Sequence, residues 1–463
     1  MILRRRNLAL LLATFVCALG CATKTAPPPV LLISVNGLRA DALGPRLTPN
    51  LHALTASASW SGRAISTSSD NAPALASVLT GLRPWQHQVL LDGGVLARRY
   101  ITIAQALGTL GYHTAGFAHQ RNLRRANGLA RGFDAFDGDS NIERICREIA
   151  RTDAAPTLIW AHLDPLREGY RRLDRFLPRL EGAPRDLPEQ VTPIDIERWF
   201  DLAKPMPAGV RAQFWALYQT DIALVDEQVG DLLKALRDSG RFDDTLIAVV
   251  STHGEDFGEH GQSSHGGSLG RALIEVPLIL KLPRAKNRET SALVIPATER
   301  VSIARLFATI LKAAGGEPPP GVAPHLGIRD PAGAISELYA KNGVNSSSLV
   351  VGDLQLERSV RFAEADPDYY RARLAVIGVD ASPALSKPAQ LILTQALKPF
   401  RQRLPWRGNG DSPTLRIQRW LVDGGIETIQ DPLLERRLLA QIERGYFAFV
   451  PEELTARESL RRR

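Results

Sequence analysis

The chain has 463 residues, of which 44% are hydrophobic and 23% are charged, so it can bury a large core and is not a disordered polypeptide. Lys and Arg outnumber Asp and Glu by 57 to 49, which gives a formal net charge of +8. The basic residues are spread along the chain without the interleaved aromatic side chains typical of nucleic-acid binders, so we expect no nucleic-acid partner.

The first 20 residues have the pattern of an export signal. Three arginines at residues 4–6 precede an apolar stretch over residues 8–19 that is too short to span a bilayer. Ala18-Leu19-Gly20-Cys21 then resembles the lipobox of bacterial lipoproteins, in which the signal is cut before a cysteine that receives lipid. The alternative is ordinary signal cleavage with Cys21 incidental.

The lipobox resemblance implies a signal peptide over residues 1–20, lipidation of Cys21 and a tether over residues 21–29. We therefore expect a lipid-anchored protein of the bacterial cell envelope that faces the periplasm. Ala22 is not the aspartate associated with inner-membrane retention in some bacteria, which slightly favours the outer membrane.

From residue 30 onward, apolar runs of strand length alternate with segments of helical periodicity. This alternation predicts an α/β fold with a large, mostly parallel sheet covered by helices. The expected strands read as continuous apolar runs, so the sheet is expected to be buried on both faces; they span residues 30–35, 114–119, 157–163, 245–251 and 276–282. The clearest helix is expected over about residues 208–238, and residues 165–207 are expected to form a loop region over one end of the sheet.

A Pro- and Gly-rich break over residues 315–327 precedes a change in the sequence pattern. The remainder has the mixed short strands and helices of a small α+β unit. We therefore expect a main domain over residues 30–330 and a C-terminal α+β subdomain over residues 331–463.

Six segments resemble, in their order along the chain, the sulfatase branch of the alkaline-phosphatase-like hydrolases. Their joint order is more specific than any one of them, and the resemblance covers nearly the whole chain after residue 29. The segments are VLLISVNGLRADALG…RLTPNLHALTASA (30–58), ALASVLTGLRPWQHQV (74–89), LGYHTAGFAHQRNL…RGFDAFD (110–137), WAHLDP (160–165), STHGEDFGEHGQSSHGGSL (251–269) with VPLIL (276–280), and QDPLLERRL (430–438). The resemblance implies the alkaline-phosphatase-like fold.

The resemblance also implies a chemistry. Members of this family hydrolyse sulfate or phosphate esters with calcium or another divalent cation that several carboxylates hold. Position by position, the nucleophile falls on Asn71, and the cation ligands fall on Asn36, Gly37, Thr252 and His253. An amide nitrogen is no nucleophile, and these four metal positions supply no carboxylate. We therefore expect no cofactor and no tightly bound calcium or magnesium.

Basic residues fall on other positions that face substrate in family members. They are His119, Arg121, His162 and His265. With the carboxylates and the cation gone, these side chains predict a positively charged cleft that binds an oxyanion without cleaving it.

The favoured interpretation is a sulfatase-like pseudoenzyme with an anion-binding or interaction role, whose partner is a sulfated or phosphorylated ligand or an envelope protein. One alternative is an active hydrolase or transferase with a rebuilt centre, in which Ser69 supplies the hydroxyl and histidines hold a softer metal such as zinc. A Ser69 hydroxyl within reach of a histidine would favour that alternative. The remaining alternative is a purely structural envelope protein.

Overall fold

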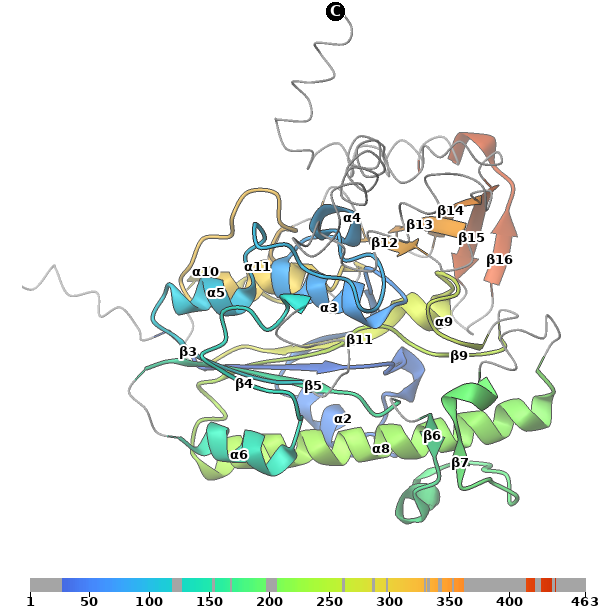
Figure 1. Cartoon of the computed structure of the whole chain (residues 1–463), viewed down its shortest axis with the longest axis horizontal. Coiled ribbons are helices and arrows are strands. Elements are labelled where there is room, and N and C mark those ends of the chain that lie inside the picture. The colour runs from blue at the N-terminus through green and yellow to red at the C-terminus, as the bar shows by residue number, and fades with distance from the viewer. Residues whose placement is uncertain are drawn as a thin grey trace, which may run out of the picture.

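The computed structural model describes residues 27–118, 127–151, 155–166, 169–196, 206–259, 263–284, 288–296, 299–328, 330, 334–339, 344–351, 354–361, 414–420, 426–434 and 438. Its main element is a seven-stranded sheet (Figure 1). In spatial order the strands are β2 (Ser59–Ile65), β11 (Glu275–Lys281), β8 (Leu246–Ser251), β1 (Val30–Val35), β5 (Thr157–Leu163), β3 (His113–Ala118) and β4 (Ala135–Asp137).

The central strands are parallel. β1 pairs with β5 on one side and with β8 on the other, and β3 and β4 continue the parallel part. β11 runs antiparallel to both β8 and β2. The parallel pairing places the carboxyl ends of β1, β5 and β8 side by side, which is where open α/β sheets bind their ligands.

Helices cover both faces of this sheet (Figure 1). One face is covered by α2 (Pro49–Thr55), α6 (Ile142–Ala150) and α8 (Ala208–Asp238), and the other by α3 (Asn71–Thr80), α5 (Ile103–Gly108) and α11 (Arg305–Ala313). Successive strand residues pack on opposite faces: Leu31 and Ile33 of β1 lie in the core with α8, whereas Val30 and Leu32 lie in the core with α3. The strands are therefore apolar throughout, as predicted from the continuous runs.

Short elements complete the described part of this unit. They are η1 (Ala40–Ala42), α4 (Pro84–His87), η3 (Asp174–Arg179), α9 (Arg271–Ile274), α10 (Arg288–Ser291), the ribbon of β6 (Tyr170–Arg171) with β7 (Gln190–Val191), and the ribbon of β9 (Asp256–Phe257) with β10 (Ser263–Ser264). The first ribbon and η3 occupy the region expected to be a loop.

Buried polar contacts join α2 to α8. The carboxylate of Asp226, in the middle of α8, accepts hydrogen bonds from the backbone N–H groups of Asn50 at 3.1 Å and Leu51 at 2.8 Å. These groups belong to the first turn of α2, where backbone donors lack helical partners and the helix dipole favours negative charge. Gly230 of α8 lets Asn50 approach, because an added Cβ would lie 2.7 Å from its side chain.

The expected strands and the long helix are present with small shifts at their ends. The helix expected over residues 208–238 is α8, and the strand expected over residues 276–282 is β11, one residue earlier. The sequence does not predict β2, because this edge strand has only two buried residues, at its end, and lacks a continuous apolar run.

A second, antiparallel sheet of five strands follows the main unit along the chain. It consists of β12 (Ala334–Tyr339), β13 (Val344–Val351), β14 (Leu354–Arg361), β15 (Thr414–Trp420) and β16 (Ile426–Ile429). Ala334, Leu338 and Val350 pack with Ile65 and Leu273 of the main unit. The backbone N–H of Glu337 donates to the carbonyl of Thr67 at 2.8 Å, so this sheet contacts the segment that leads into α3.

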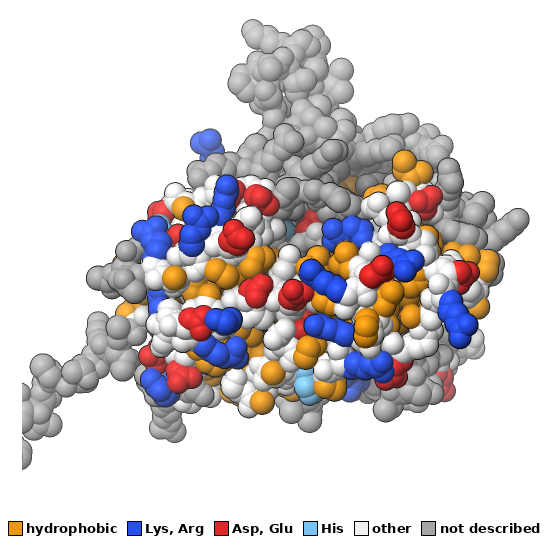
Figure 2. Space-filling view, turned by 90° about the horizontal axis from the view of Figure 1, so that it is seen from below, with side chains coloured by type: hydrophobic (Ala, Val, Ile, Leu, Met, Phe, Trp, Pro, Cys, Tyr) orange, Lys and Arg blue, Asp and Glu red, His pale blue; other side chains and the backbone are white. Residues whose placement is uncertain are grey.

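The surface on the α8 side carries charges of both signs. Figure 2 shows Lys and Arg side chains next to Asp and Glu side chains across this face, with apolar side chains between them. The positive net charge therefore does not gather here into a basic surface of the kind that binds nucleic acid. In the described part of the chain, no helix is long and apolar enough to cross a membrane.

Candidate functional site

The candidate site lies at the carboxyl ends of β1, β5 and β8. Val35 is paired with Leu163 and with Ser251, so Asn36, Asp164 and Thr252 follow at the same edge. The side-chain amide of Asn36 donates to Asp164 Oδ1 at 2.7 Å, whereas its Oδ1 is buried without a hydrogen-bond partner among the described residues. The residue at the position of the family's first cation ligand is therefore an amide hydrogen-bonded to a carboxylate that follows the neighbouring strand.

The other positions that the resemblance assigns to the cation offer little to calcium. Gly37 has φ +74°, and an added Cβ would lie 2.3 Å from Leu166 Cδ1, so a side chain does not fit there. The Thr252 hydroxyl donates to the Val35 carbonyl at 3.3 Å. Calcium and magnesium take six or more oxygen ligands, several of them carboxylates. The residues at these positions therefore do not fit the family's cation.

Asn71 is the first residue of α3 and is fully buried. Its Nδ2 lies 3.3 Å from His162 Nε2, and the next backbone N–H, of Ala72, donates to Asp92 Oδ1 at 2.7 Å. A carboxylate at the start of a helix is favourable because the first turn has unpaired N–H groups. The position assigned to the nucleophile is thus occupied by a buried amide that contacts His162. The Asp92 carboxylate already caps the first turn of α3 beside it.

His162, on β5, is bound on both ring nitrogens. Its Nδ1 lies 2.9 Å from Ser34 Oγ on β1, and the indole N–H of Trp160 donates to the same oxygen at 2.9 Å. Burial lowers the pKa of His162 to about 3, since the charged imidazolium would lose its hydration. His162 is therefore a neutral hydrogen-bonding residue and does not provide positive charge.

His253 and His265 stack on each other with ring centroids 4.3 Å apart and an angle of 29° between the planes. Burial, with the positive charge of His265, lowers the pKa of His253 well below its usual range. Burial alone would lower the pKa of His265 too, but the Glu255 carboxylate, 3.1 Å from its Nδ1, raises it to about 9. One histidine of the pair is therefore neutral, and the other is cationic but paired with an acid.

The described residues do not form the positively charged cleft that the sequence predicts. His162 and His253 are neutral, and His265 forms an ion pair with Glu255. The carboxylates of Asp70 and Asp92 also raise the pKa of His265. The expected positive charge is therefore absent at His162 and paired with an acid at His265, and anion binding by these residues stays a prediction. His119 and Arg121, the other two predicted anion-binding residues, lie outside the described residues.

The sequence interpretation overlooked two acids of this site. Glu255 follows His253 by two residues in STHGED, and Asp164 ends the segment WAHLD directly after β5. Glu255 is indicated by its place next to a predicted metal position, and Asp164 is indicated by its place directly after a parallel strand.

The Ser69 hydroxyl is not within reach of a described histidine, which was the arrangement that would favour a rebuilt nucleophile. Its hydroxyl is fully buried and has no hydrogen-bond partner in the described part of the chain. Its backbone carbonyl instead accepts a hydrogen bond from Gly266 N at 3.1 Å. No described histidine thus lies within hydrogen-bond distance of the Ser69 hydroxyl, whereas Asn71 contacts His162.

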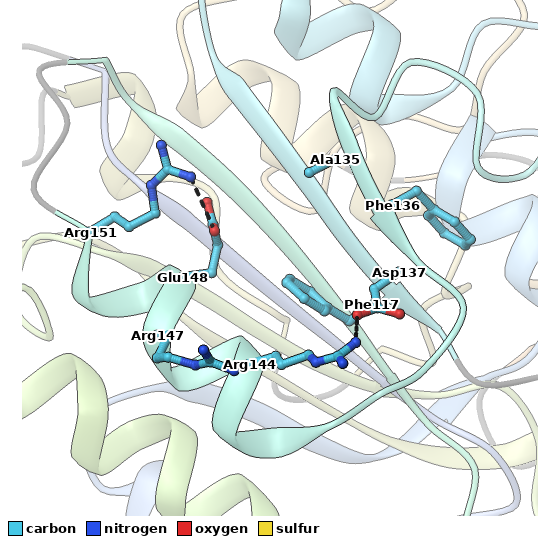
Figure 3. A pocket seen from close by; sticks show the side chains of 8 residues that line it. All are labelled: Phe117, Ala135, Phe136, Asp137, Arg144, Arg147, Glu148 and Arg151. Carbon is cyan, nitrogen blue, oxygen red and sulfur yellow. Dashed lines mark hydrogen bonds and ion pairs between the residues drawn. The ribbon is translucent and has the colours of Figure 1, made fainter.

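A separate cavity of about 540 Å³ lies between α6 and the β3–β4 edge of the sheet (Figure 3). It contains none of the candidate site residues. Two of its arginines are paired, Arg144 with Asp137 at 2.6 Å and Arg151 with Glu148 at 3.5 Å. This cavity is away from the strand ends that carry the candidate site, and we assign it no part in the chemistry.

Two stretches of the chain match known protein families. A family model described as "Sulfatase" matches residues 168–316, and one described as "Type I phosphodiesterase / nucleotide pyrophosphatase" matches residues 30–93. The two stretches contain Asn36, Asn71 and His253. Human iduronate 2-sulfatase is 29% identical over 112 residues, which are 21% of this chain and 20% of that protein. The chain thus matches about a fifth of the length of its first curated relatives.

Solved structures are similar over most of the chain. A 2-O GAG sulfatase superposes with a TM-score of 0.56 and 15% identity, over 88% of this chain and 96% of that one. The phosphonate monoester hydrolase of Agrobacterium radiobacter superposes with a TM-score of 0.55 and 18% identity, over 87% of this chain and 100% of that one. These likenesses confirm the fold expected from the sequence.

Proposed function

We propose that this chain, which is similar to sulfatases of the alkaline-phosphatase-like superfamily, binds a ligand in the cleft of that fold without hydrolysing it. The observation that carries the proposal is the contact of Asn71 with His162 at the start of α3. An amide nitrogen shares its lone pair with the carbonyl group and does not attack an ester. His162 is engaged by Ser34 and Asn71, so it is not free to activate another nucleophile.

The cation positions support the same proposal. Family hydrolases use a dication to stabilise the charge that develops on the ester oxygens. Here Asn36 is bonded to Asp164 and Thr252 to the backbone of β1. Loss of the nucleophile and of the family's cation ligands leaves the hydrolytic reaction without its two main contributors.

The ligand class that we propose is a sulfate or phosphate ester, because the relatives and structural neighbours include sulfatases and a phosphonate monoester hydrolase. An envelope protein that presents such a group is the alternative partner. We further propose that the protein is a lipoprotein anchored through Cys21 at the periplasmic face of the outer membrane. The lipobox-like sequence before Cys21 supports this location.

The test is an ester-hydrolysis assay on the purified protein. Aryl sulfates, a sulfated disaccharide, aryl phosphates and an aryl phosphonate are each incubated with wild type, Asn71→Ala and Ser69→Ala, with calcium, magnesium or zinc added. We expect the same rate in all three proteins and in buffer. A wild-type rate above buffer that Ser69→Ala abolishes would replace this proposal by the rebuilt hydrolase, and one that Asn71→Ala abolishes would also overturn it.

A second test restores a nucleophilic atom at residue 71. Asn71→Ser and Asn71→Cys restore a nucleophilic atom but not the cation ligands, so we expect no turnover from either variant. Ester turnover by Asn71→Ser would mean that the rest of the centre is competent, contrary to the argument from Asn36 and Thr252.

A further inference from the structure

Three potential metal ligands converge beside the carboxyl end of β8. They are His253, Glu255 and His265, and one ligand atom of each lies within 4.8 Å of those of the other two. His253 and Glu255 are buried in the turn between β8 and β9, and His265 follows β10 directly. Of the four positions that the family resemblance assigns to the cation, only His253 belongs to this set.

His253 has a lone pair available for a ligand. Its Nδ1 lies 2.6 Å from the carbonyl oxygen of Gly254, and because a carbonyl only accepts, Nδ1 carries the proton and Nε2 the lone pair. Nε2 is buried and has no hydrogen-bond partner among the described residues. Metal-bound histidines typically donate their other ring N–H to a carbonyl or carboxylate in this way. An unpartnered buried lone pair needs an explanation, and a metal provides one.

Glu255 is oriented by a contact on its far oxygen. The Tyr170 hydroxyl donates to Oε1 at 2.8 Å, and Oε2 lies 3.1 Å from His265 Nδ1. Burial and the neighbouring Glu255 carboxylate raise the pKa of Tyr170 well above its usual range, so the phenol remains a donor. Oε2 is therefore directed toward His265, and Tyr170 fixes the carboxylate as outer groups do in metal sites.

We propose that His253, Glu255 and His265 bind a divalent transition metal, with zinc the preferred ion. Two imidazole nitrogens and one carboxylate form a typical zinc ligand set with an open fourth position, whereas calcium and magnesium require more oxygen ligands. Zinc–nitrogen distances of about 2.0–2.1 Å place tetrahedral ligand atoms roughly 3.4 Å apart, so the side chains must approach one another slightly. The side chain of His265 is 27% exposed and has room to do so.

The metal would change the charge of the cleft. On binding, His265 releases its proton and the dication takes that place against Glu255, so the site gains one positive charge. The open position can then accept a sulfate or phosphate oxygen in a cleft whose described histidines are otherwise neutral or paired. The site goes beyond the proposed function, because zinc binding requires neither an ester ligand nor the absence of hydrolysis.

The test uses full-length protein treated with chelator, desalted and titrated with zinc chloride by calorimetry, with bound metal counted by elemental analysis. Wild type is expected to bind one equivalent with a Kd of micromolar or below. His253→Ala and His265→Ala are expected to weaken binding at least 100-fold, while His52→Ala, which removes an exposed histidine of α2, has no effect. Circular dichroism shows whether each variant is folded, and the partly exposed His265 provides a second variant should His253→Ala not fold.

Cobalt(II) provides an independent readout of the ligands. Cobalt bound to wild type is expected to show the intense visible absorption of a four-coordinate site, and His265→Ala should lose it. Absence of zinc binding by wild type, or zinc binding that persists unchanged in folded His253→Ala and His265→Ala, would overturn the site. Ester hydrolysis by the zinc-loaded wild type would instead overturn the proposed non-hydrolytic function and leave the metal site in place.

Discussion

The Nε2 atom of His162 lies 3.3 Å from the amide nitrogen of Asn71. The Asn71 amide nitrogen can only donate, so His162 Nε2 accepts and the single proton of the neutral ring is on Nδ1, which donates to Ser34 Oγ. The same oxygen also accepts from the Trp160 indole N–H. The chain from Trp160 through Ser34 and His162 thus ends on Asn71 and positions it.

This relay predicts that Asn71 contributes to stability. Asn71→Ala leaves the buried Nε2 of His162 without a hydrogen-bond donor, which costs about 1–3 kcal/mol of unfolding free energy. Ser69→Ala is the matched control, because the buried Ser69 hydroxyl has no partner in the described part of the chain and its removal should change stability by less than about 0.5 kcal/mol. Urea unfolding of both variants checks this. Equal losses would show that the relay does not stabilise the fold.

Restoring an acid at Asn36 is predicted to destabilise the protein at neutral pH. Asn36→Asp replaces the donor to Asp164 Oδ1 by a second carboxylate, which raises the pKa of the pair in the folded state above its unfolded value. One to two pKa units correspond to about 1.4–2.7 kcal/mol. Because the folded form then binds more protons, this loss is full at pH 7, declines as the pH falls through the raised folded pKa, and is largely gone at about pH 4.

Asn36→Ala separates the charge effect from the lost hydrogen bond. It removes the same donor without adding a carboxylate, so its loss of stability should be similar at pH 7 and pH 4. Unfolding free energies of wild type and both variants at the two pH values provide the measurement. An Asn36→Asp deficit as large at pH 4 as at pH 7 would exclude repulsion with Asp164.

His87 is predicted to contribute to acid sensitivity. Burial lowers its pKa to about 3, and Val89 N–H donates to its Nδ1 at 3.1 Å. The unfolded state, with a pKa of about 6.5, gains a proton that the folded state excludes, so stability is lost as the pH falls from 6.5 toward 3. At pH 5 the loss is about 2 kcal/mol. The stability difference between pH 7 and pH 5 should shrink by that amount in His87→Gln, and an unchanged difference would refute the assignment.

Membrane attachment is predicted to depend on Cys21. Cys21→Ser removes the residue that would receive acyl chains, and with them the apolar area that anchors a lipoprotein in the bilayer. Fractionation of cells that express each form should move the protein from the membrane to the soluble fraction. A mutant that remains with the membrane, together with a wild-type N-terminus that carries no lipid by mass spectrometry, would contradict the lipobox interpretation.

Local patterns determined the strands and the long helix. The apolar runs at residues 30–35 and 157–163 predicted β1 and β5, because a strand buried on both faces requires apolar side chains at every position. Helical spacing of apolar residues likewise predicted α8. The same criterion does not predict β2, because an edge strand does not require a continuous run of apolar residues. The ordered landmarks, compared as a set, indicated the fold that the superpositions confirm.

The sequence by itself also determined which atoms are missing from the candidate site: Asn71 supplies no nucleophile, and Asn36 supplies no carboxylate. Only the tertiary structure decided the charges of the remaining histidines, because a pKa depends on burial and on neighbours that are distant in the chain. Ser34 and Asn71 bind His162 from separate elements, and the loop after β10 brings His265 to Glu255. The same residue type is therefore neutral at residue 162 and cationic at residue 265.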